Sequence, residues 1–280
     1  GPAPFDARAV MADRIGYVPN AAARRLQSGG SDALGFLVTG NERSFDEMFF
    51  LNIIEGAWGR LAGSGVDLLV MSATEGRAEI ASYRRLVEGR RVDGLIVGRV
   101  RAQDPRIEYL SSVRFPYVAF GGRPETTAPA VHVEIDSQQT MGLVLDHLAG
   151  FGHQCVALLA GDPRYCFVSA RARAFEAAAA ARGMIAVAVE GTLDRVTLGA
   201  ARALAESGLE PGVDVSLVAI GDNPIFEFFN PPIDAVRLPT QAMAAHAVDL
   251  LFSIRDGLTP RLKAAWPTEL VARQSSGPAS

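Results

Sequence analysis

The sequence predicts an α/β protein built from two doubly wound lobes, each with a parallel sheet covered by helices. Three observations indicate this fold. Short apolar runs of strand length recur along the chain, helix-period stretches separate them, and the rhythm restarts near His132. Strands that alternate with helices are typical of βαβ units, which build parallel sheets. Two lobes account for this number of strands better than one very wide sheet.

Four apolar runs predict the strands of the first lobe. They are ALGFLV (33–38), VDLLVM (66–71), GLIV (94–97) and YVAF (117–120). Helices are predicted between them at 47–61, 79–88 and 107–111. In the first of these helices, apolar side chains from Phe50 to Leu61 recur at helical spacing and share one face.

The second half repeats the pattern. Its predicted strands are HVEI (132–135), CVALLAG (155–161), IAVAV (185–189) and VSLVAIG (215–221). Its predicted helices lie at 137–149, 169–182 and 196–207, and the chain ends with a short strand around Val236, a helix at 241–255 and a strand near 268–271.

Composition excludes several classes of protein. The chain of 280 residues is 49% hydrophobic and carries a net charge of −4, which is globular composition without a global positive field. Residues 1–30 nevertheless hold four arginines against two aspartates. Cys155 and Cys166 form no CxxC pair, so we expect reduced, structural thiols. No run is long enough to span a membrane and no secretory signal pattern is present, which favours a cytoplasmic protein.

Enzyme motifs are missing from the sequence. It contains no G-x-G-x-x-G after a strand, no P-loop and no G-x-S-x-G elbow. Its four histidines have no metal-ligand spacing. We therefore expect no catalytic residue, no metal and no cofactor.

Ligand groups follow the predicted strands instead. In open α/β sheets, ligands bind outside the carboxyl ends of the strands. The candidates there are Phe49, Phe50, Arg99, Asp136, Arg171, Asp194 and Asn223. Aromatic rings beside carboxylate, amide and guanidinium groups suit a polyhydroxylated ligand. The alternatives are that the acidic residues only cap helices and that the two phenylalanines belong to the core.

The stretch GYVPNAAARRLQSGG (16–30) predicts a short helix that begins after Asn20 and ends before Gly29. Isolated helices of this length are marginal in water. Leu26 is its only large apolar side chain. The helix either packs on the body as a linker, or folds on a partner with Leu26 as an apolar wedge and the arginines near phosphates.

This stretch resembles the hinge helix of LacI/GalR-family transcriptional regulators, and more loosely their α-glucoside-type branch. Further similar motifs follow in the family's order and cover nearly the whole chain: FDEMFF, RRVDGLIV, HLAGFGHQCVALLAG, SARARAF, LEPGVDVSLVAIGDN and NPPIDAVRLP. The resemblance implies two lobes of the type I periplasmic-binding-protein kind, joined by three crossovers, that close on a small effector.

The resemblance also assigns residues. Arg171 would grip effector hydroxyls or carboxylates, Asp194 would accept hydroxyl hydrogens, and Phe49 or Phe50 would pack on the ligand. Leu26 would insert into the central base step of an operator. The DNA contacts are expected from Asn20, Ala23, Arg24 and Leu26.

The implied organisation has three parts. Residues 1–30 are the remnant of a DNA-binding domain with its hinge helix. Residues 33–151 plus 224–256 form the N-terminal lobe, and residues 152–222 plus 258–274 form the C-terminal lobe. The crossovers are expected near Phe151, Asp222 and Gly257. In EGTLDRVTLG (190–199) the family has a further helix and strand, so the join at Gly191–Asp194 is short. Either this lobe has lost a βα unit, or residues of the natural chain are absent from this sequence at the join. We favour the second alternative, because removing a strand from a parallel sheet would expose apolar surface on its neighbours.

The sequence thus predicts a ligand-responsive transcriptional regulator that acts as a repressor and has a sugar as its effector. Operator DNA and a second copy in a homodimer are the expected partners. A solute-binding receptor of a sugar transport system is the alternative with the same fold, although the hinge stretch argues against it. A sugar-processing enzyme would need paired carboxylates in the cleft, and no motif supports them.

Overall fold

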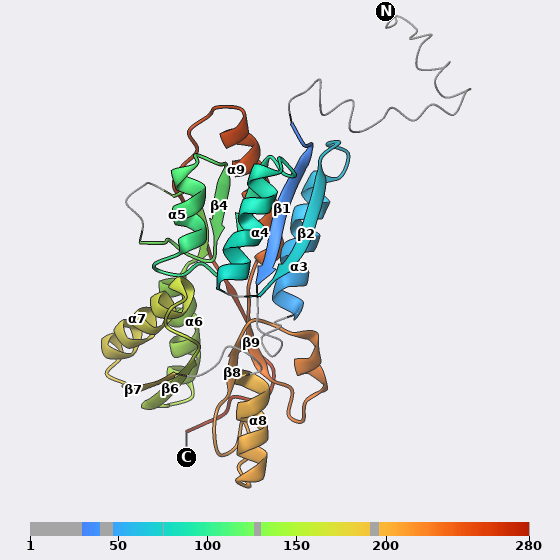
Figure 1. The fold of residues 1–280 in the computed structure, drawn as a ribbon. Helices are drawn as coiled ribbons and strands as arrows, with labels where there is room; N and C mark the ends of the chain where they lie inside the picture. Colours follow the sequence, from blue (N-terminus) through green and yellow to red (C-terminus); the bar gives the residue numbers. More distant parts are fainter. Residues whose placement is uncertain (1–29, 40–46, 75, 126–129, 191–195, 280) are drawn as a thin grey trace, which may run out of the picture.

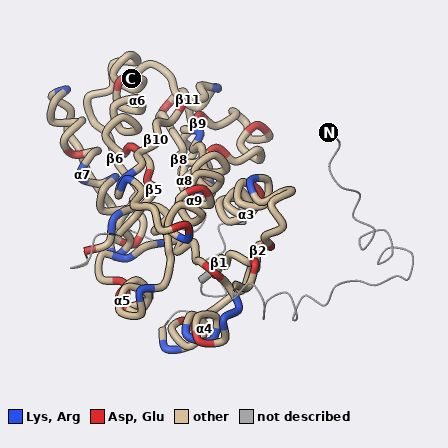
Figure 2. The backbone as a smooth tube through the Cα atoms, turned by 90° about the horizontal axis from the view of Figure 1, so that it is seen from above, with Lys and Arg blue, Asp and Glu red and all other residues tan. Residues whose placement is uncertain are grey.

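The computed structural model describes residues 30–39, 47–74, 76–125, 130–190 and 196–279. They form two lobes, one above the other in the view of Figure 1. The DNA-contact residues predicted within 16–30, and Asp194, lie outside the described residues. Figure 2 shows basic and acidic residues interspersed along the described chain, with both signs on α4 (Arg77–Glu88).

The first lobe is a six-stranded parallel sheet in the order β10-β5-β4-β3-β1-β2. Its strands are β1 (Ala33–Thr39), β2 (Asp67–Ala73), β3 (Gly94–Val97), β4 (Tyr117–Phe120), β5 (His132–Ile135) and β10 (Lys263–Trp266). Its helices are α3 (Glu47–Leu61), α4, α5 (Pro105–Ser112) and α9 (Thr240–Arg255). Separate apolar cores lie on the two faces of the sheet, one beneath α3 and α9 and the other beneath α4 and α5.

The second lobe contains two separate sheets. One pairs β6 (Cys155–Ala160) with β7 (Ile185–Glu190), and the other has the order β11-β9-β8. The strands of the second sheet are β8 (Val218–Ile220), β9 (Asp234–Arg237) and β11 (Glu269–Val271). The helices of this lobe are α6 (Ser137–Gly150), α7 (Cys166–Ala181), α8 (Val196–Glu206) and the short η1 (Pro224–Phe228).

The prediction of two α/β lobes is confirmed, but the predicted lobe boundaries are wrong. Helix α6 packs on α7 in the second lobe, so the chain first crosses at Asp136 and not near Phe151. Strand β9 pairs with β8, which places the second crossing after Arg237. Strand β10, which the sequence analysis missed, pairs with β5 and moves the third crossing past Trp266. Hydrophobic periodicity locates an element but does not state which sheet it joins.

A buried charged cluster supports the loop after β3. Asp104 caps α5 by accepting a hydrogen bond from the Arg106 amide, and its carboxylate also pairs with the Arg106 guanidinium at 2.6 Å. Glu79 on α4 pairs with Arg106 at 3.0 Å. Burial alone would raise the pKa of Asp104, but the hydrogen bond and charge of Arg106 outweigh it and lower that pKa. The cluster therefore fixes α4, α5 and this loop to one another.

Candidate functional site

A cavity of about 1870 Å³ lies at the carboxyl ends of the strands of both lobes. Residues that follow β3, β4, β5, β6 and β8 line it, together with the segments that cross between the lobes. Ligand pockets typically measure roughly 300–1,000 Å³. This cavity is larger because it continues from the cleft into the space between β6 and β8.

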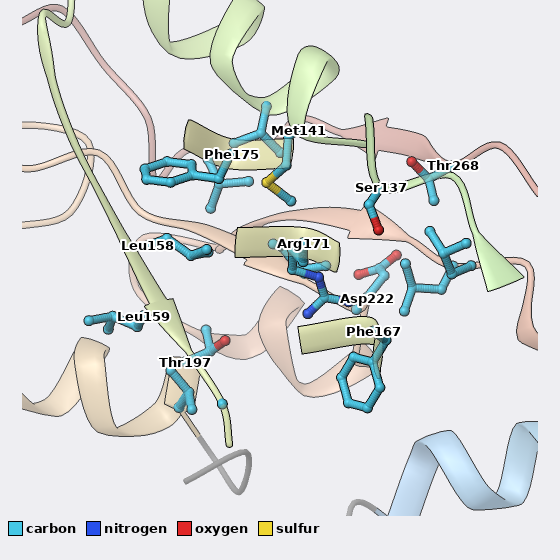
Figure 3. Close-up of a pocket in the computed structure, with 18 of the residues that line it drawn as sticks. Ser137, Met141, Leu158, Leu159, Phe167, Arg171, Phe175, Thr197, Asp222 and Thr268 are labelled. Atoms are coloured by element: carbon cyan, nitrogen blue, oxygen red, sulfur yellow. The ribbon is translucent and has the colours of Figure 1, made fainter. Parts of the chain in front are cut away.

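Arg171 provides a half-buried positive charge in this cavity. It lies on α7, the helix that follows β6, and Figure 3 shows its guanidinium near Asp222, between Ser137 and Phe167. Its Cζ atom lies 5.6 Å from the centre of the Phe167 ring. Burial lowers the pKa of Arg171 to about 10, and no described carboxylate lies within ion-pair distance of it. A ligand that supplies acceptor oxygens would relieve this desolvation.

Asp222 faces the same space from the end of β8. Its two carboxylate oxygens accept hydrogen bonds from Arg273 at 2.8 Å and from Arg237 at 2.9 Å. Arg237 is the last residue of β9, just before the second crossing. Two guanidinium partners hold this carboxylate in a defined orientation, so it is suited to accept hydrogen bonds from ligand hydroxyls.

The first lobe contributes Arg99 and Phe49. Arg99 is only 7% exposed and adopts a positive φ of 49° directly after β3. Its Cζ atom lies 5.0 Å from the centre of the Phe50 ring. Phe49 lines the cavity and packs edge-on against Phe120 with ring centres 6.1 Å apart. An aromatic surface and a guanidinium of the first lobe therefore line the same cavity as Arg171.

Several cavity residues were missed by the sequence analysis. Ser137 and Phe167 begin the helices after β5 and β6, so the rule that ligands bind at strand ends could have found them. Glu134 is held by Lys263 at 2.7 Å. Thr268 lies on the third crossing, where its hydroxyl contacts the Thr140 hydroxyl at 3.0 Å. Only the tertiary structure brings this last segment to the site.

The structure brings together four of the seven predicted ligand residues, and they line one cavity: Phe49, Arg99, Arg171 and Asn223. Phe50 is 3% exposed in the core beneath α3. Asp136 caps α6 by accepting from the Gln139 amide and does not line the cavity. Asn223 also caps η1 through a bond from the Ile225 amide. Phe50 and Asp136 thus have the structural roles that were weighed as alternatives.

The lobes also touch directly beside the cleft. Arg101 and Tyr165 form an antiparallel bridge, in which the Cys166 amide donates to the Val100 carbonyl at 2.9 Å. Gly122 lies against the same turn, since a Cβ atom at this residue would lie 2.7 Å from the Cys166 Cβ. The cleft is therefore closed on one side by a short piece of paired backbone.

The chemistry of this cavity is that of recognition. It combines guanidinium groups, oriented carboxylates, hydroxyls and aromatic rings, which together bind hydroxyl groups and apolar C–H faces. Among the described residues, no three His, Cys, Asp or Glu side chains gather as metal ligands. None of the described helices has the length and apolarity needed to cross a bilayer.

Comparison with known proteins agrees with this architecture. Residues 31–226 match the family model for periplasmic binding proteins and the sugar binding domain of the LacI family. Residues 186–276 match a periplasmic binding protein-like domain. The chain therefore has the two-lobed periplasmic-binding-protein fold, and it belongs to the LacI family.

Curated relatives are regulators of transcription. The chain is 34% identical over 160 residues to the HTH-type transcriptional regulator RafR of Escherichia coli, a match over 57% of this chain and 47% of RafR. It is 27% identical over 303 residues to the HTH-type regulator AglR of Rhizobium meliloti (strain 1021), over 94% of this chain and 83% of AglR. The chain thus spans less than half of RafR and most of AglR.

Solved structures share the fold. A lac repressor dimer bound to operator and the anti-inducer ONPF superposes with a TM-score of 0.81 at 21% identity, covering 93% of this chain and 99% of that chain. A complex of the regulator CelR with cellobiose gives 0.78 at 24% identity, covering 94% and 88%. A LacI-family regulator from Bifidobacterium animalis subsp. lactis DSM 10140 gives 0.79 at 21% identity, covering 90% and 100%.

Proposed function

We propose that this protein is a repressor-type regulator of transcription that senses a small sugar between its two lobes. The observation that carries the proposal is the cavity that Arg171 and Asp222 of one lobe line together with Phe49 and Arg99 of the other. A ligand that bridges these residues contacts both lobes at once. Its affinity therefore depends on how the lobes are arranged.

That dependence is what regulation requires. A ligand shifts an equilibrium between two arrangements only by its difference in affinity for them, and the coupling is reciprocal. The sugar would favour one lobe arrangement, and the arrangement would set the distance between two hinge segments in a homodimer. Operator binding and sugar binding would then each alter the other.

The DNA side of the proposal rests on the family and on residues 16–30. Two copies of the hinge stretch would meet one pseudo-palindromic operator, with Leu26 as the wedge and Asn20, Ala23 and Arg24 beside the backbone. Such a protein acts in the cytoplasm. Binding rather than turnover is proposed because two arginines hold the Asp222 carboxylate and the Asp136 carboxylate caps a helix.

A thermal-shift screen against neutral mono- and disaccharides, cellobiose included, tests the sugar. A ligand that binds only the folded state raises the unfolding temperature with its concentration. We expect at least one sugar to do so in the wild type and not in Arg171→Ala. The matched control is Arg202→Ala, which removes an exposed arginine on α8. If no sugar raises the unfolding temperature of the wild type, or if a sugar raises it equally in the wild type and in Arg171→Ala, the assignment of this sugar site is wrong. Turnover of a bound sugar would point to an enzyme instead.

A further inference from the structure

Side chains link the three segments that cross between the lobes. Gln139, in the first turn of α6, follows the first crossing and reaches the third. Its side-chain oxygen accepts a hydrogen bond from the Thr268 amide at 2.9 Å, and its side-chain nitrogen donates to the Thr268 carbonyl at 3.0 Å. The Gln139 side chain thus pairs with both backbone groups of Thr268, as a neighbouring strand would. The first and third crossings therefore move together.

Arg237 links the second crossing to the third. It is the last residue of β9, and only Leu238 and Pro239 separate it from α9 of the first lobe. Its register partner in β11 is Glu269, which lies just beyond the third crossing. The Arg237 guanidinium lies 3.6 Å from the Glu269 carboxylate. A shift of the second crossing therefore displaces the Arg237 side chain.

The same guanidinium binds Asp222, which borders the cavity (Figure 3) beside a second and more rigid partner. Arg237 donates to one Asp222 oxygen at 2.9 Å, and Arg273 donates to the other at 2.8 Å. The Arg273 side chain is only 11% exposed, and it also donates to the Ile233 carbonyl at 2.8 Å. Its backbone amide donates to the Asp234 carboxylate. Arg273 is therefore the fixed partner of Asp222.

Arg237 is the adjustable partner. Its side chain is 54% exposed, so water can replace either of its two carboxylate partners. Exposed ion pairs contribute little to stability, because water screens them and the long side chains lose entropy in forming them. A ligand hydroxyl that donates to the same Asp222 oxygen can therefore shift the Arg237 guanidinium at little cost.

We propose that Arg237 is the positioning residue that transmits occupation of the cavity to the crossings. A sugar hydroxyl bound to Asp222 shifts the Arg237 guanidinium. That shift moves the second crossing and, through Glu269 and Thr268, the other two. A ligand changes the balance between two arrangements only through interactions that differ between them, and the contact of Arg237 with Asp222 supplies such a difference. The inference rests on the proposed function and adds the route from the sugar to the crossings.

Amide hydrogen exchange of residues 238–243 tests this route, since they form the second crossing and the first turn of α9. The probes are the neutral mono- and disaccharides of the thermal-shift screen, cellobiose included. In the wild type, we expect a saturating sugar to change this exchange rate about threefold or more. Arg237→Met keeps the length of the side chain without its charge, and it should lose most of this change at saturating sugar. Its sugar affinity should fall about threefold to tenfold, because Asp222 keeps only Arg273.

Two further variants separate transmission from general damage near the crossings. Arg237→Lys restores a cation within reach of Asp222, so it should recover about half or more of the sugar-induced change in exchange. The matched control is Arg60→Met, which breaks a similarly exposed ion pair with Asp249 farther along α9. It should leave both the affinity and the exchange response unaltered.

Three results would overturn the proposal. They are a full sugar-induced change in Arg237→Met, no recovery in Arg237→Lys, and a loss of affinity in Arg237→Met as complete as in Arg171→Ala. The last result would show that Arg237 only builds the sugar site. If no sugar binds the wild type, the proposed function fails and this inference fails with it. If a sugar binds and Arg237→Met responds fully, only the route through Arg237 fails.

Discussion

Arg101 links the contact between the two lobes to the buried charged cluster inside the first lobe. Its guanidinium pairs with the Glu79 carboxylate at 2.8 Å, while its backbone bridges to Tyr165 of the second lobe. Glu79 is 1% exposed and also pairs with Arg106. A displacement of Arg101 at the contact between the lobes therefore acts directly on α4, and it acts on α5 through Arg106.

Removing the shared carboxylate should be costly. Glu79→Gln leaves the buried Arg106 with one carboxylate partner and Arg101 without its closest one, so we expect a loss of about 3–5 kcal/mol in the free energy of unfolding. Urea denaturation measures it. The control is Arg60→Ala, whose partner Asp249 is 45% exposed, and its cost should stay below about 1 kcal/mol. Similar losses in the two variants would contradict the assigned importance of the buried cluster.

Gly122 limits how closely the lobes approach. Its φ of 145° is unfavourable for other residues, and a Cβ atom there would lie 2.7 Å from the Cys166 Cβ. Gly122→Ala should therefore separate the lobes and increase the radius of gyration measured by solution X-ray scattering. Gly59→Ala, in an open part of α3, should leave it unchanged. An unaltered radius of gyration in Gly122→Ala would contradict this prediction, because the contact would then accommodate the added methyl group without moving the lobes.

The Arg171 side chain should lower the free energy of unfolding when no ligand is bound. Burial depresses its pKa to about 10, so the folded state disfavours the charged form that predominates below that pH. The penalty is fully present at pH 7 and is relieved only as the pH rises through about 10. Arg171→Met should raise the free energy of unfolding at pH 7 by about 1–3 kcal/mol while abolishing effector binding. Denaturation and calorimetry measure the two effects, and a less stable variant at pH 7 would refute the first.

Substitutions of the two adjacent phenylalanines should have different effects, one on stability and the other on effector binding. Phe50→Ala removes a 3% exposed core side chain and should cost about 3–5 kcal/mol of stability. Phe49→Ala should cost less stability but lower the affinity for effector about tenfold or more, because Phe49 lines the cavity. Urea denaturation and calorimetry on both variants check this division. If Phe49→Ala lost more stability and Phe50→Ala lost more effector affinity, Phe49 would be the core residue and Phe50 the ligand contact.

The wedge role of Leu26 concerns a protein that carries the full DNA-binding domain. There, Leu26→Ala should weaken operator binding at least tenfold and leave effector affinity unchanged, because only the DNA complex uses the inserted side chain. Fluorescence anisotropy and calorimetry measure the two affinities. A loss shared equally by both, or by neither, rejects the wedge.

The helices and strands were largely predictable, but the lobe boundaries were not. Apolar periodicity located α3, α6 and α7 because it depends on neighbours along one element. It missed β10, whose sequence KAAW is short, and with it the third crossing. Strand pairing is a contact between distant parts of the chain, and α6 shows that a correctly placed helix can still be assigned to the wrong lobe.

The candidate site was predictable only in its principle. Because ligands bind at strand ends, the sequence could select Phe49, Arg99 and Arg171, which do line the cavity. The same rule selected Asp136, whose carboxylate caps α6, and Phe50, whose ring lies in the core. A carboxylate at a strand end can cap the next helix or face the ligand, and only the direction of the side chain decides between them.

The sequence by itself determined the family, the alternation of strands and helices, and the hinge stretch, since these depend on local pattern and motif. Tertiary structure alone decided which strands share a sheet, that Arg237 and Arg273 orient Asp222, and that the apolar Val187 of β7 lines the cavity. The physical reason is burial. The sequence shows that Ile185 and Val187 are apolar, but whether another element covers them depends on contacts that only the folded chain contains.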